Sequence, residues 1–296
     1  MNTPSIPYVE LPVLPLWPGQ EALSLKPFGL LVAIGVSLGA ASASRYGKRR
    51  GLDAATLTSF IYWVVGSGFV FGHVLDVLLY SPERLKDDPL AIIRLWDGLS
   101  SYGGFVGGVL GALAFRIQRG VPVLPYADVV ASGLPLGWVF GRAGCAVVHD
   151  HPGILSQAWF AVRFPGGGRL DLGLLEMALS IPLAVAFALL KKRAWPWGFF
   201  IAWMCAIYGP LRFALDFLRV AEPTWIQGSL YEPDRRYLTL TPAQWASLLV
   251  FAFGLYMLLH VRSRVDRDSA FFPPKPATRA EVVRARRSSI EEPPAH

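Results

Sequence analysis

The sequence predicts an all-α, polytopic membrane protein with seven transmembrane helices. Of the 296 residues, 53% are hydrophobic and 17% are charged, and the mean hydropathy is +0.41. This composition is too apolar for an ordinary soluble domain. The apolar residues also form blocks long enough to cross a bilayer, which takes about 20 residues of helix. Helices are predicted because an open sheet could not satisfy its backbone groups in lipid.

Seven blocks meet this condition, at residues 27–47, 57–80, 102–118, 125–148, 172–190, 197–218 and 241–261. They define a membrane domain at 27–262 without an internal repeat. Residues 1–26 are predicted as a periplasmic segment rather than a signal peptide, because no basic stretch precedes an apolar core. Residues 263–296 are rich in Pro, Arg, Ser and Glu and are predicted as a basic, disordered cytoplasmic tail.

Basic residues in alternate loops predict the orientation. They follow the first, third and fifth spans and the last one: Arg45, Lys48, Arg49, Arg50, Arg116, Arg119, Lys191, Lys192, Arg193, Arg262, Arg264 and Arg267. The positive-inside rule then places the N-terminus outside and the C-terminus in the cytoplasm. The net charge of +7 lies mostly in the tail and indicates an orientation signal and contact with anionic lipid, not nucleic-acid binding. Cys145 and Cys205 lie in apolar blocks, so no disulfide is predicted.

With this orientation, the unusual polar residues gather at the outer ends of four spans, while the inner ends carry only ordinary loop charges. The outer residues are His73, Asp76, Tyr102, Arg142, Arg212, Asp216 and Arg219. The last three are spaced i, i+4, i+7 and share one helical face. Charged side chains within a span are costly, and they usually face a bundle interior and mark function.

Arg142 and Arg212 are predicted to bind a phospholipid headgroup, because guanidinium suits bidentate phosphate recognition. Arg219 is interpreted equally well as an arginine that snorkels to the interface. Gly103 and Gly104 permit either close helix packing or close approach of a ligand.

His149, Asp150 and His151 follow the fourth span directly. No metal site is predicted, because adjacent helical residues point about 100° apart and no second His or Cys cluster follows. The histidines are interpreted as solvated, or as a base or hydrogen-bond donor. Asp128 and Glu176 are further acids within spans, each a possible partner for a buried basic or polar group.

The order of these motifs resembles the bacterial prolipoprotein diacylglyceryl transferase family over about residues 27–260. Its signature begins G-R-x-G-N and ends about ten residues later in glycine, and here reads G-R-A-G-C-A-V-V-H-D-H-P-G, ending at Gly153. Asp128 and Gly137 precede it at similar spacing. Further similar segments are P-F-G-L-L at 27–31, S-Y-G-G-F at 101–105, L-L-E at 174–176, R-F-A-L-D-F-L-R at 212–219 and T-P-A-Q-W at 241–245.

The chain also departs from the family pattern at five positions. Phe28 replaces a functional tyrosine of the family, and Tyr102 replaces the histidine that is proposed as its base. Cys145 replaces the asparagine of the signature, and Asp150 and Asp216 each replace a glutamate. Arg142, Arg212 and Arg219 match three basic residues of the family, whereas an arginine that the family places in the second span has no clear counterpart here. The phosphate-binding part therefore resembles the family, and the proton-handling part differs. Tyrosine, with an ordinary pKa of about 10, is a weaker base than histidine at neutral pH.

The resemblance implies transfer of the diacylglyceryl group from phosphatidylglycerol to the lipobox cysteine of a preprolipoprotein, in the bacterial inner membrane. It implies a catalytic set of Tyr102, His149, Asp150 and Arg212. The substrate-binding set would be Arg142, Phe28, Asp216, Arg219, Gly103, Gly104 and Gly153. No cofactor, metal or nucleic acid is expected, and the chain is expected to be a monomer.

Two other hypotheses remain open from the sequence. A divergent member of this fold could bind lipid or peptide without transfer, or use another acceptor. A transporter with a charged midplane site is disfavoured, because the charges cluster at one end and no repeat symmetry is present.

Overall fold

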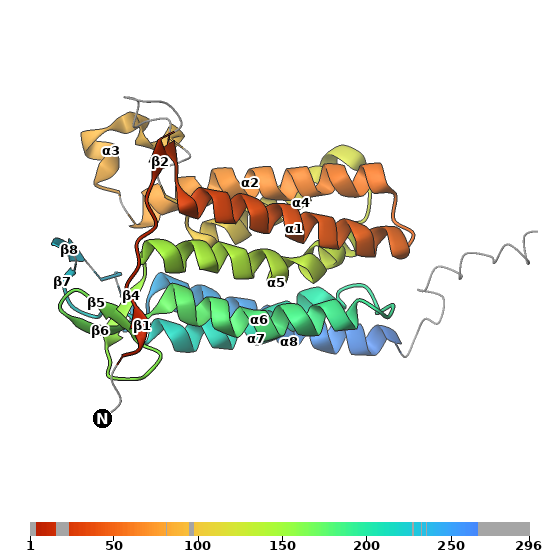
Figure 1. The fold of residues 1–296 in the computed structure, drawn as a ribbon. Helices are drawn as coiled ribbons and strands as arrows, with labels where there is room; N and C mark the ends of the chain where they lie inside the picture. Colours follow the sequence, from red (N-terminus) through yellow and green to blue (C-terminus); the bar gives the residue numbers. More distant parts are fainter. Residues whose placement is uncertain are drawn as a thin grey trace, which may run out of the picture.

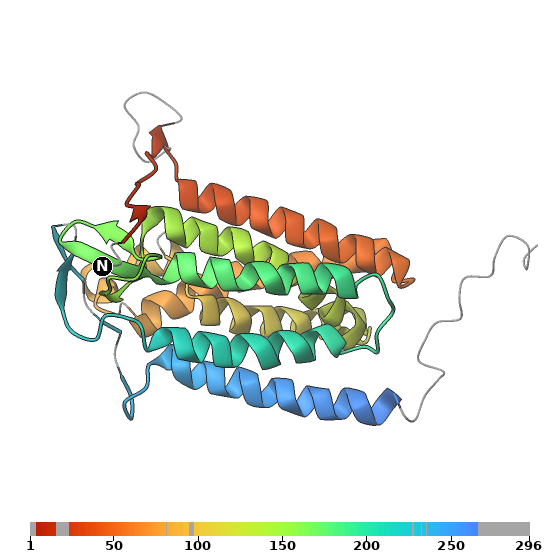
Figure 2. The ribbon, with the colours of Figure 1, turned by 60° about the horizontal axis from the view of Figure 1, so that its bottom comes forward.

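The computed structural model describes residues 4–15, 24–80, 82–94, 98–226, 228–231, 233–234 and 236–265. It is a bundle of long helices that lie side by side and alternate in direction, with short strands gathered at one end (Figures 1 and 2). The predicted tail beyond residue 265 lies outside the described residues.

Within the described residues, seven long helices form the bundle: α1 (Pro27–Arg49), α2 (Ala54–Tyr80), α4 (Ser101–Arg119), α5 (Val123–Val148), α6 (Leu172–Leu190), α7 (Phe199–Asp216) and α8 (Pro242–Val265). Each predicted block falls on one of them, with ends that differ by a few residues. Six are long and apolar enough to cross a membrane, which indicates a multi-pass membrane protein. The remaining one, α4, has 19 residues and packs along α2.

Short strands at one end of the bundle were not predicted. A four-stranded sheet has the order β1–β5–β6–β4, from Ile6–Pro7, Val162–Phe164, Gly167–Asp171 and Pro152–Leu155. Two ribbons pair β2 (Leu14–Pro15) with β3 (Ser24–Leu25) and β7 (Thr224–Ile226) with β8 (Ser229–Tyr231). The connection from α2 to α4 contains α3 (Arg84–Asp87) and the 3₁₀ helix η1 (Pro89–Ile93). Strands of two to five residues are too short to show an alternating pattern in the sequence.

The end away from the strands is held by an aromatic core. Phe60 meets Phe115 edge to face with ring centroids 5.2 Å apart, and Tyr46 meets Phe200 in the same way at 5.4 Å. All four side chains are buried. Such pairs add roughly 0.5–1.5 kcal/mol beyond the burial of their area.

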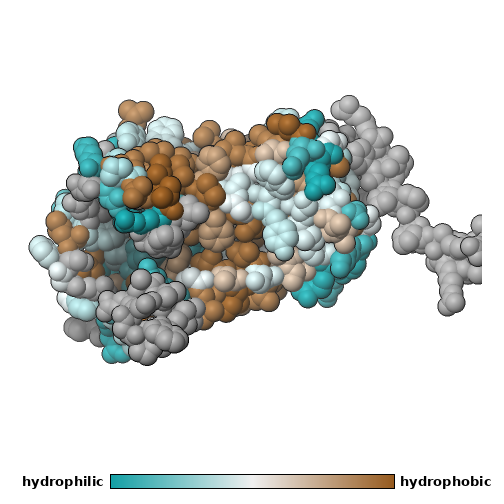
Figure 3. Space-filling model, turned by 90° about the horizontal axis from the view of Figure 1, so that it is seen from above, coloured by the Kyte–Doolittle hydropathy of each residue, from teal (hydrophilic) through white to brown (hydrophobic). Residues whose placement is uncertain are grey.

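The outer surface of the bundle is apolar. Large hydrophobic side chains such as Leu30, Ile34 and Leu38 of α1 and Leu249 and Leu259 of α8 are exposed. In Figure 3, apolar residues cover much of the middle of one face, and hydrophilic residues gather toward both ends. An apolar patch of this extent is too large for contact with water and fits contact with lipid chains.

Glycines allow α1 and α5 to approach closely. A Cβ at Gly133 would lie 2.4 Å from the carbonyl oxygen of Gly39, and one at Gly35 would lie 2.6 Å from that of Gly137. The backbones therefore touch where any side chain would collide, which is the packing that small residues give to membrane helices.

We expect Gly133→Ala to lower the thermal stability of the purified protein. Overpacking of this kind costs about 1–3 kcal/mol, which exceeds the gain in helix propensity of about 1 kcal/mol. Gly141→Ala is the matched control in the same helix, because a Cβ there meets nothing within 4 Å. Thermal unfolding in detergent should rank Gly141→Ala at or above the unsubstituted protein and Gly133→Ala below it; equal melting temperatures for the two variants would contradict this packing.

Candidate functional site

The candidate site lies at the end of the bundle that carries the strands. Arg142 near the end of α5, Glu176 in the second turn of α6 and Arg212 in the last two turns of α7 converge there. All three side chains are at most 6% exposed. The i, i+4 arrangement of Tyr208 and Arg212 on α7 points both residues at the same glutamate.

Glu176 is the centre of this group. Its Oε1 lies 3.0 Å from Arg142 Nε and accepts hydrogen bonds from the Tyr208 hydroxyl at 2.8 Å and the Trp138 indole at 3.1 Å. Its Oε2 lies 3.9 Å from Arg212 Nε. A carboxylate with this many donors is ionised, and it compensates the burial of two guanidinium groups.

A chain of charges continues from Arg212 toward the surface. Asp216 Oδ1 lies 3.0 Å from Arg212 Nη1 and 2.8 Å from Arg219 Nε. Arg219 Nη1 reaches Asp234 at 2.8 Å, and the Thr241 hydroxyl bonds Asp216. Although these distances are short, Asp216 Oδ1 and the Nε atoms of both arginines lack the alignment of a hydrogen bond. The Nε donors of both arginines are thus buried without a hydrogen-bond partner among the described residues.

Arg142 is fixed by three further groups. Its Nη2 donates to Ser101 Oγ at 3.0 Å, its Nη1 lies 3.7 Å from Cys145 Sγ, and its guanidinium lies over the Trp138 ring at 5.1 Å. These contacts come from α4 and from one turn either side of Arg142 on α5, so the guanidinium has a single supported orientation.

Tyr102 and Phe28 approach the same end from other helices. The Tyr102 hydroxyl shares a hydrogen bond with Ser247 of α8. Phe28, in the first turn of α1, lies against Gly144, where a Cβ would be 3.0 Å from its ring. Both predicted residues are therefore on helices that border the arginine cluster.

His149 pairs with Asp171 rather than with the adjacent Asp150. His149 Nδ1 lies 2.5 Å from Asp171 Oδ2, and its Nε2 lies 3.3 Å from the backbone oxygen of Val9. Tyr8 stacks on the imidazole with ring centroids 4.2 Å apart. Asp171 ends β6 and also caps α6 by accepting from Leu174 N at 2.9 Å. Burial raises the pKa of Asp171, and the hydrogen bond with His149 opposes that rise.

This pairing also changes the interpretation of the H-D-H segment as a solvated loop. The His149 side chain is 7% exposed, and His149 ends α5 with a left-handed backbone at φ 50°. The sheet folds back over this end, which brings Asp171 to His149 across 22 residues. Asp150 and His151, which bond to each other, keep substantial contact with solvent.

Cys145, Asp150 and His151 bring one potential metal-ligand atom each within 4.8 Å of one another. The guanidinium of Arg142 beside the Cys145 sulfur opposes a second positive charge there. His151 Nδ1 is already bonded to Asp150. We therefore assign no metal to this group.

The predicted glycines lie at backbone contacts. A Cβ at Gly103 would be 2.7 Å from the carbonyl oxygen of Phe71, so this glycine allows α4 to approach α2, and Gly104 lies at the same contact. Gly153 fits between the backbone of Leu218 and Leu170 and forms a bridge with Arg219. Gly103 and Gly104 thus set the spacing of α2 and α4, and Gly153 sets that of β4 and the segment that carries Arg219.

Several residues of the site were not predicted from the sequence. Tyr208, Trp138 and Asp171 were missed, as was the central role of Glu176. A helical signal existed for two of them, because Tyr208 stands four residues before Arg212 and Trp138 four before Arg142. Asp171 carried no such signal, since its contact with His149 depends on the sheet.

The chain resembles known proteins over most of its length. The family model described as prolipoprotein diacylglyceryl transferase matches residues 19–260. A relative from Sinorhizobium medicae (strain WSM419) is 34% identical over 185 residues, 58% of this chain and 64% of the relative. Relatives from Agrobacterium fabrum and Allorhizobium ampelinum are 27% and 28% identical, over 82% and 87% of this chain and 91% and 92% of their own lengths.

All three relatives carry the name phosphatidylglycerol–prolipoprotein diacylglyceryl transferase. The family model spans most of the chain, including every helix that contributes to the arginine cluster. The chain belongs to the prolipoprotein diacylglyceryl transferase family.

Proposed function

We propose that this protein transfers the diacylglyceryl group of phosphatidylglycerol to the lipobox cysteine thiol of preprolipoproteins, as a monomer in the bacterial inner membrane. Membership of the family supports the reaction. The observation that carries it to specific residues is the buried Arg142–Glu176–Arg212 group within an apolar bundle. The reaction as written needs no metal or organic cofactor.

The proposed topology has seven spans, with α4 as the third, the N-terminus outside and the C-terminus in the cytoplasm. Residues 1–26 and the strands then lie on the outer side, residues 27–262 form the membrane domain, and the basic tail lies inside. The loop at Lys191–Arg193 and the end of α1 at Lys48–Arg50 support this, because they are dense in basic residues and lie at the end away from the strands.

The topology predicts the behaviour of reporter fusions. Green fluorescent protein fused after residue 265 should be fluorescent, whereas alkaline phosphatase at that point should be inactive, because each reporter folds on one side of the membrane only. Alkaline phosphatase inserted after residue 165, in the β5–β6 turn, should be active. The reverse pattern would refute the orientation.

In the proposed site, the two central arginines bind the phosphoglycerol headgroup. Guanidinium carries five N–H donors in a planar fork. Arg142 is fully positioned by Glu176 and Ser101, and Arg212 keeps donors that are not aligned with Asp216 or Glu176. In a site of low dielectric, such donors stabilise the charge that develops on the phosphate as it leaves.

The proposed step forms one bond and breaks one. The peptide sulfur attacks the carbon of the diacylglyceryl unit that is bonded to the phosphate oxygen. A C–S bond forms, and the C–O bond breaks with its electron pair on the phosphate oxygen. The products are the thioether-linked lipoprotein and glycerol phosphate. The thiol must first lose its proton, because the thiolate is the nucleophile.

Two groups compete for the role in proton transfer. Tyr102 follows Ser101, which accepts a hydrogen bond from Arg142, and the Tyr102 hydroxyl is held by Ser247 of α8. In the proposal this hydroxyl orients the thiol. His149 has the imidazole–carboxylate arrangement of a general base, with Asp171 in the role expected of Asp150. Its Nε2 is turned to Val9, so proton transfer to it needs displacement of the N-terminal segment.

The remaining predicted residues receive supporting roles in the proposal. Asp216 positions Arg212 and Arg219 by bridging them. Phe28 lies in the first turn of α1 beside Gly144. Gly103, Gly104 and Gly153 allow the close backbone contacts of α4 with α2 and of β4 with the segment after α7.

We expect Arg142→Lys to lower transfer about 10²–10³-fold, the loss typical for removal of one transition-state donor. Lysine keeps a positive charge beside Glu176 but lacks the planar set of N–H donors of the guanidinium group. Arg219→Lys should lose less, since Arg219 lies at the outer end of the charge chain and is 11% exposed. The assay uses purified protein, phosphatidylglycerol and a lipobox peptide, with the mass gain of the peptide as readout.

Arg116→Lys is the matched control for this series, because Arg116 is exposed at the other end of α4. It should leave the rate unchanged. Equal losses for Arg142→Lys and Arg219→Lys would refute the phosphate assignment.

We expect Tyr102→Phe to lower transfer if the hydroxyl orients the thiol, and His149→Gln to lower it if the imidazole accepts the proton. The pH dependence separates the two roles. Loss of a general base removes the fall in rate at acidic pH, whereas loss of an orienting hydroxyl lowers the rate at every pH. The proposal for both groups fails if each variant keeps the full rate and the full pH profile.

A second candidate function rests on the substitutions at Tyr102 and Cys145. A member with these changes could bind phosphatidylglycerol or a lipobox peptide without transfer. The same assay decides between the two, because this alternative predicts binding of the lipid with no mass gain of the peptide under conditions where a family enzyme is active.

A further inference from the structure

Asp171 joins the ends of two helices that carry the site. It is the N-cap of α6, and its Oδ1 accepts from Leu174 N at 2.9 Å. Its Oδ2 lies 2.5 Å from Nδ1 of His149, which is the C-cap of α5. The Asp171 side chain has no exposed surface, and that of His149 is 7% exposed. One buried carboxylate therefore ties the start of α6 to the end of α5.

The polarity of the two helices favours this contact. The N-terminal end of a helix carries partial positive charge, and the C-terminal end carries partial negative charge. The Asp171 carboxylate lies at the start of α6, and the imidazole of His149 lies at the end of α5. Each group thus meets the helix end that stabilises it.

The imidazole of His149 is itself fixed by the segments around the sheet. Tyr8, which follows β1, stacks on it with ring centroids 4.2 Å apart, and Phe164 of β5 meets it edge to face at 5.3 Å. Its Nε2 lies 3.3 Å from the backbone oxygen of Val9. Asp171 therefore pairs with a ring whose position is set from three sides, so the contact can fix the helix that carries the carboxylate.

The two helices also touch between this contact and the buried ion pair. A Cβ at Gly173 would lie 2.8 Å from the backbone nitrogen of Ala146, so α6 begins against the backbone of α5. One turn further along α6, Glu176 Oε1 lies 3.0 Å from Arg142 Nε. Because Glu176 and Asp171 are within two turns of the same helix, a shift at the start of α6 would move Glu176 relative to Arg142.

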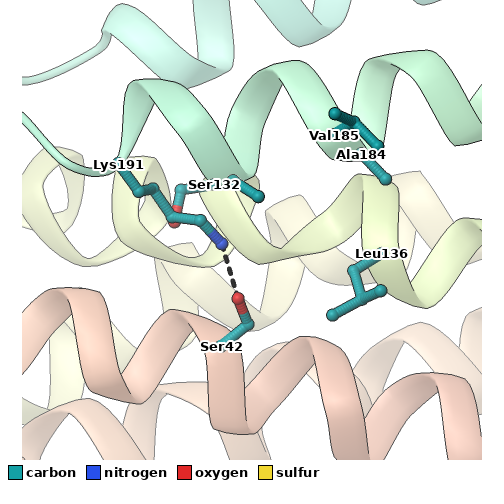
Figure 4. Close-up of a pocket in the computed structure, with 7 residues that line it drawn as sticks. Ser42, Ser132, Leu136, Ala184, Val185 and Lys191 are labelled. Carbon is teal, nitrogen blue, oxygen red and sulfur yellow. Dashed lines mark hydrogen bonds between the residues drawn. The ribbon is translucent and has the colours of Figure 1, made fainter.

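The other end of α6 is held by a different contact, although only ordinary loop charges were predicted there. Lys191 directly follows α6, and its Nζ donates to Ser42 Oγ of α1 at 2.5 Å (Figure 4). Lys191 is 8% exposed, so this contact is buried as well. It is separated from Glu176 by about four turns of helix. Of the two contacts, the one at Asp171 lies next to the ion pair.

We propose that Asp171 is a positioning residue: through His149 it fixes the start of α6 to the end of α5 and so holds Glu176 between Arg142 and Arg212. Recognition of a phosphate by two guanidinium groups requires a fixed separation between them. The His149–Asp171 contact then sets the affinity for the phospholipid headgroup. This inference rests on the proposed function, which assigns the headgroup to these arginines, but not on which group accepts the thiol proton.

The first measurement is the affinity of the purified full-length protein for a short-chain phosphatidylglycerol, by calorimetry in detergent and without peptide. Asp171→Asn should weaken binding about tenfold, the loss that corresponds to one charge-assisted hydrogen bond. Asparagine is as good an N-cap as aspartate, so the start of α6 is retained. Lys191→Met, which removes the contact at the other end of α6, is the matched control and should leave the affinity unchanged, even if its melting temperature changes.

Two variants of His149 test the same contact from the side of α5. His149→Gln keeps an N–H donor for Asp171 and should keep more of the lipid affinity than His149→Leu, which offers no donor. If Asp171 only orients His149 as a base, Asp171→Asn would keep the lipid affinity and change the pH profile of transfer. Either that result or equal affinities for the two His149 variants would overturn the positioning role.

Thermal unfolding provides an arm that needs neither lipid nor transfer. Asp171→Asn should lower the melting temperature less in an Arg142→Lys background than alone, because the flexible lysine can follow Glu176. In a Lys191→Met background the two changes should add, since distant sites act independently. Additive changes in the Arg142→Lys background would overturn the proposal. Absence of phosphatidylglycerol binding in the unsubstituted protein, together with the expected non-additive result, would count against the proposed function and not against the His149–Asp171 contact.

Discussion

The structure of this protein depends on one buried carboxylate. Glu176 receives Arg142, Tyr208 and Trp138 and faces Arg212, so it joins α5, α6 and α7 at one end of the bundle. Without it, two guanidinium groups would lie uncompensated in an apolar interior, at a cost of about 3–5 kcal/mol for a broken buried pair. The same compensation holds the arginines in fixed positions, which is what recognition of a phosphate requires.

The two ends of the bundle are stabilised by different means. Aromatic pairs such as Phe60 with Phe115 close the end away from the strands, and a chain of ionic contacts from Arg142 to Asp234 closes the other. The glycine contacts between α1 and α5 run between these ends. Apolar contacts and ionic contacts therefore hold different parts of the same helices together.

The segment that precedes α1 both adds a strand to the sheet and contacts His149. β1 joins the sheet beside β5, and the residues that follow place Tyr8 and the Val9 carbonyl on His149. His149 is thereby buried between an N-terminal segment and the carboxylate of Asp171. A change at the N-terminus would thus reach the imidazole directly, although 140 residues separate Val9 from it in sequence.

The sequence by itself determined the helical membrane architecture and the end of the bundle at which the buried polar residues gather. Lengths of apolar blocks, basic loops and the spacing of Arg212, Asp216 and Arg219 are local properties, and each can be read from a few turns of helix. Only the tertiary structure decided which acid meets which base. Asp171 rather than Asp150 pairs with His149, Glu176 bridges two arginines, and Lys191 turns into the bundle. Such partners come from different elements, and their choice follows from helix packing and from short strands that leave no pattern in the sequence.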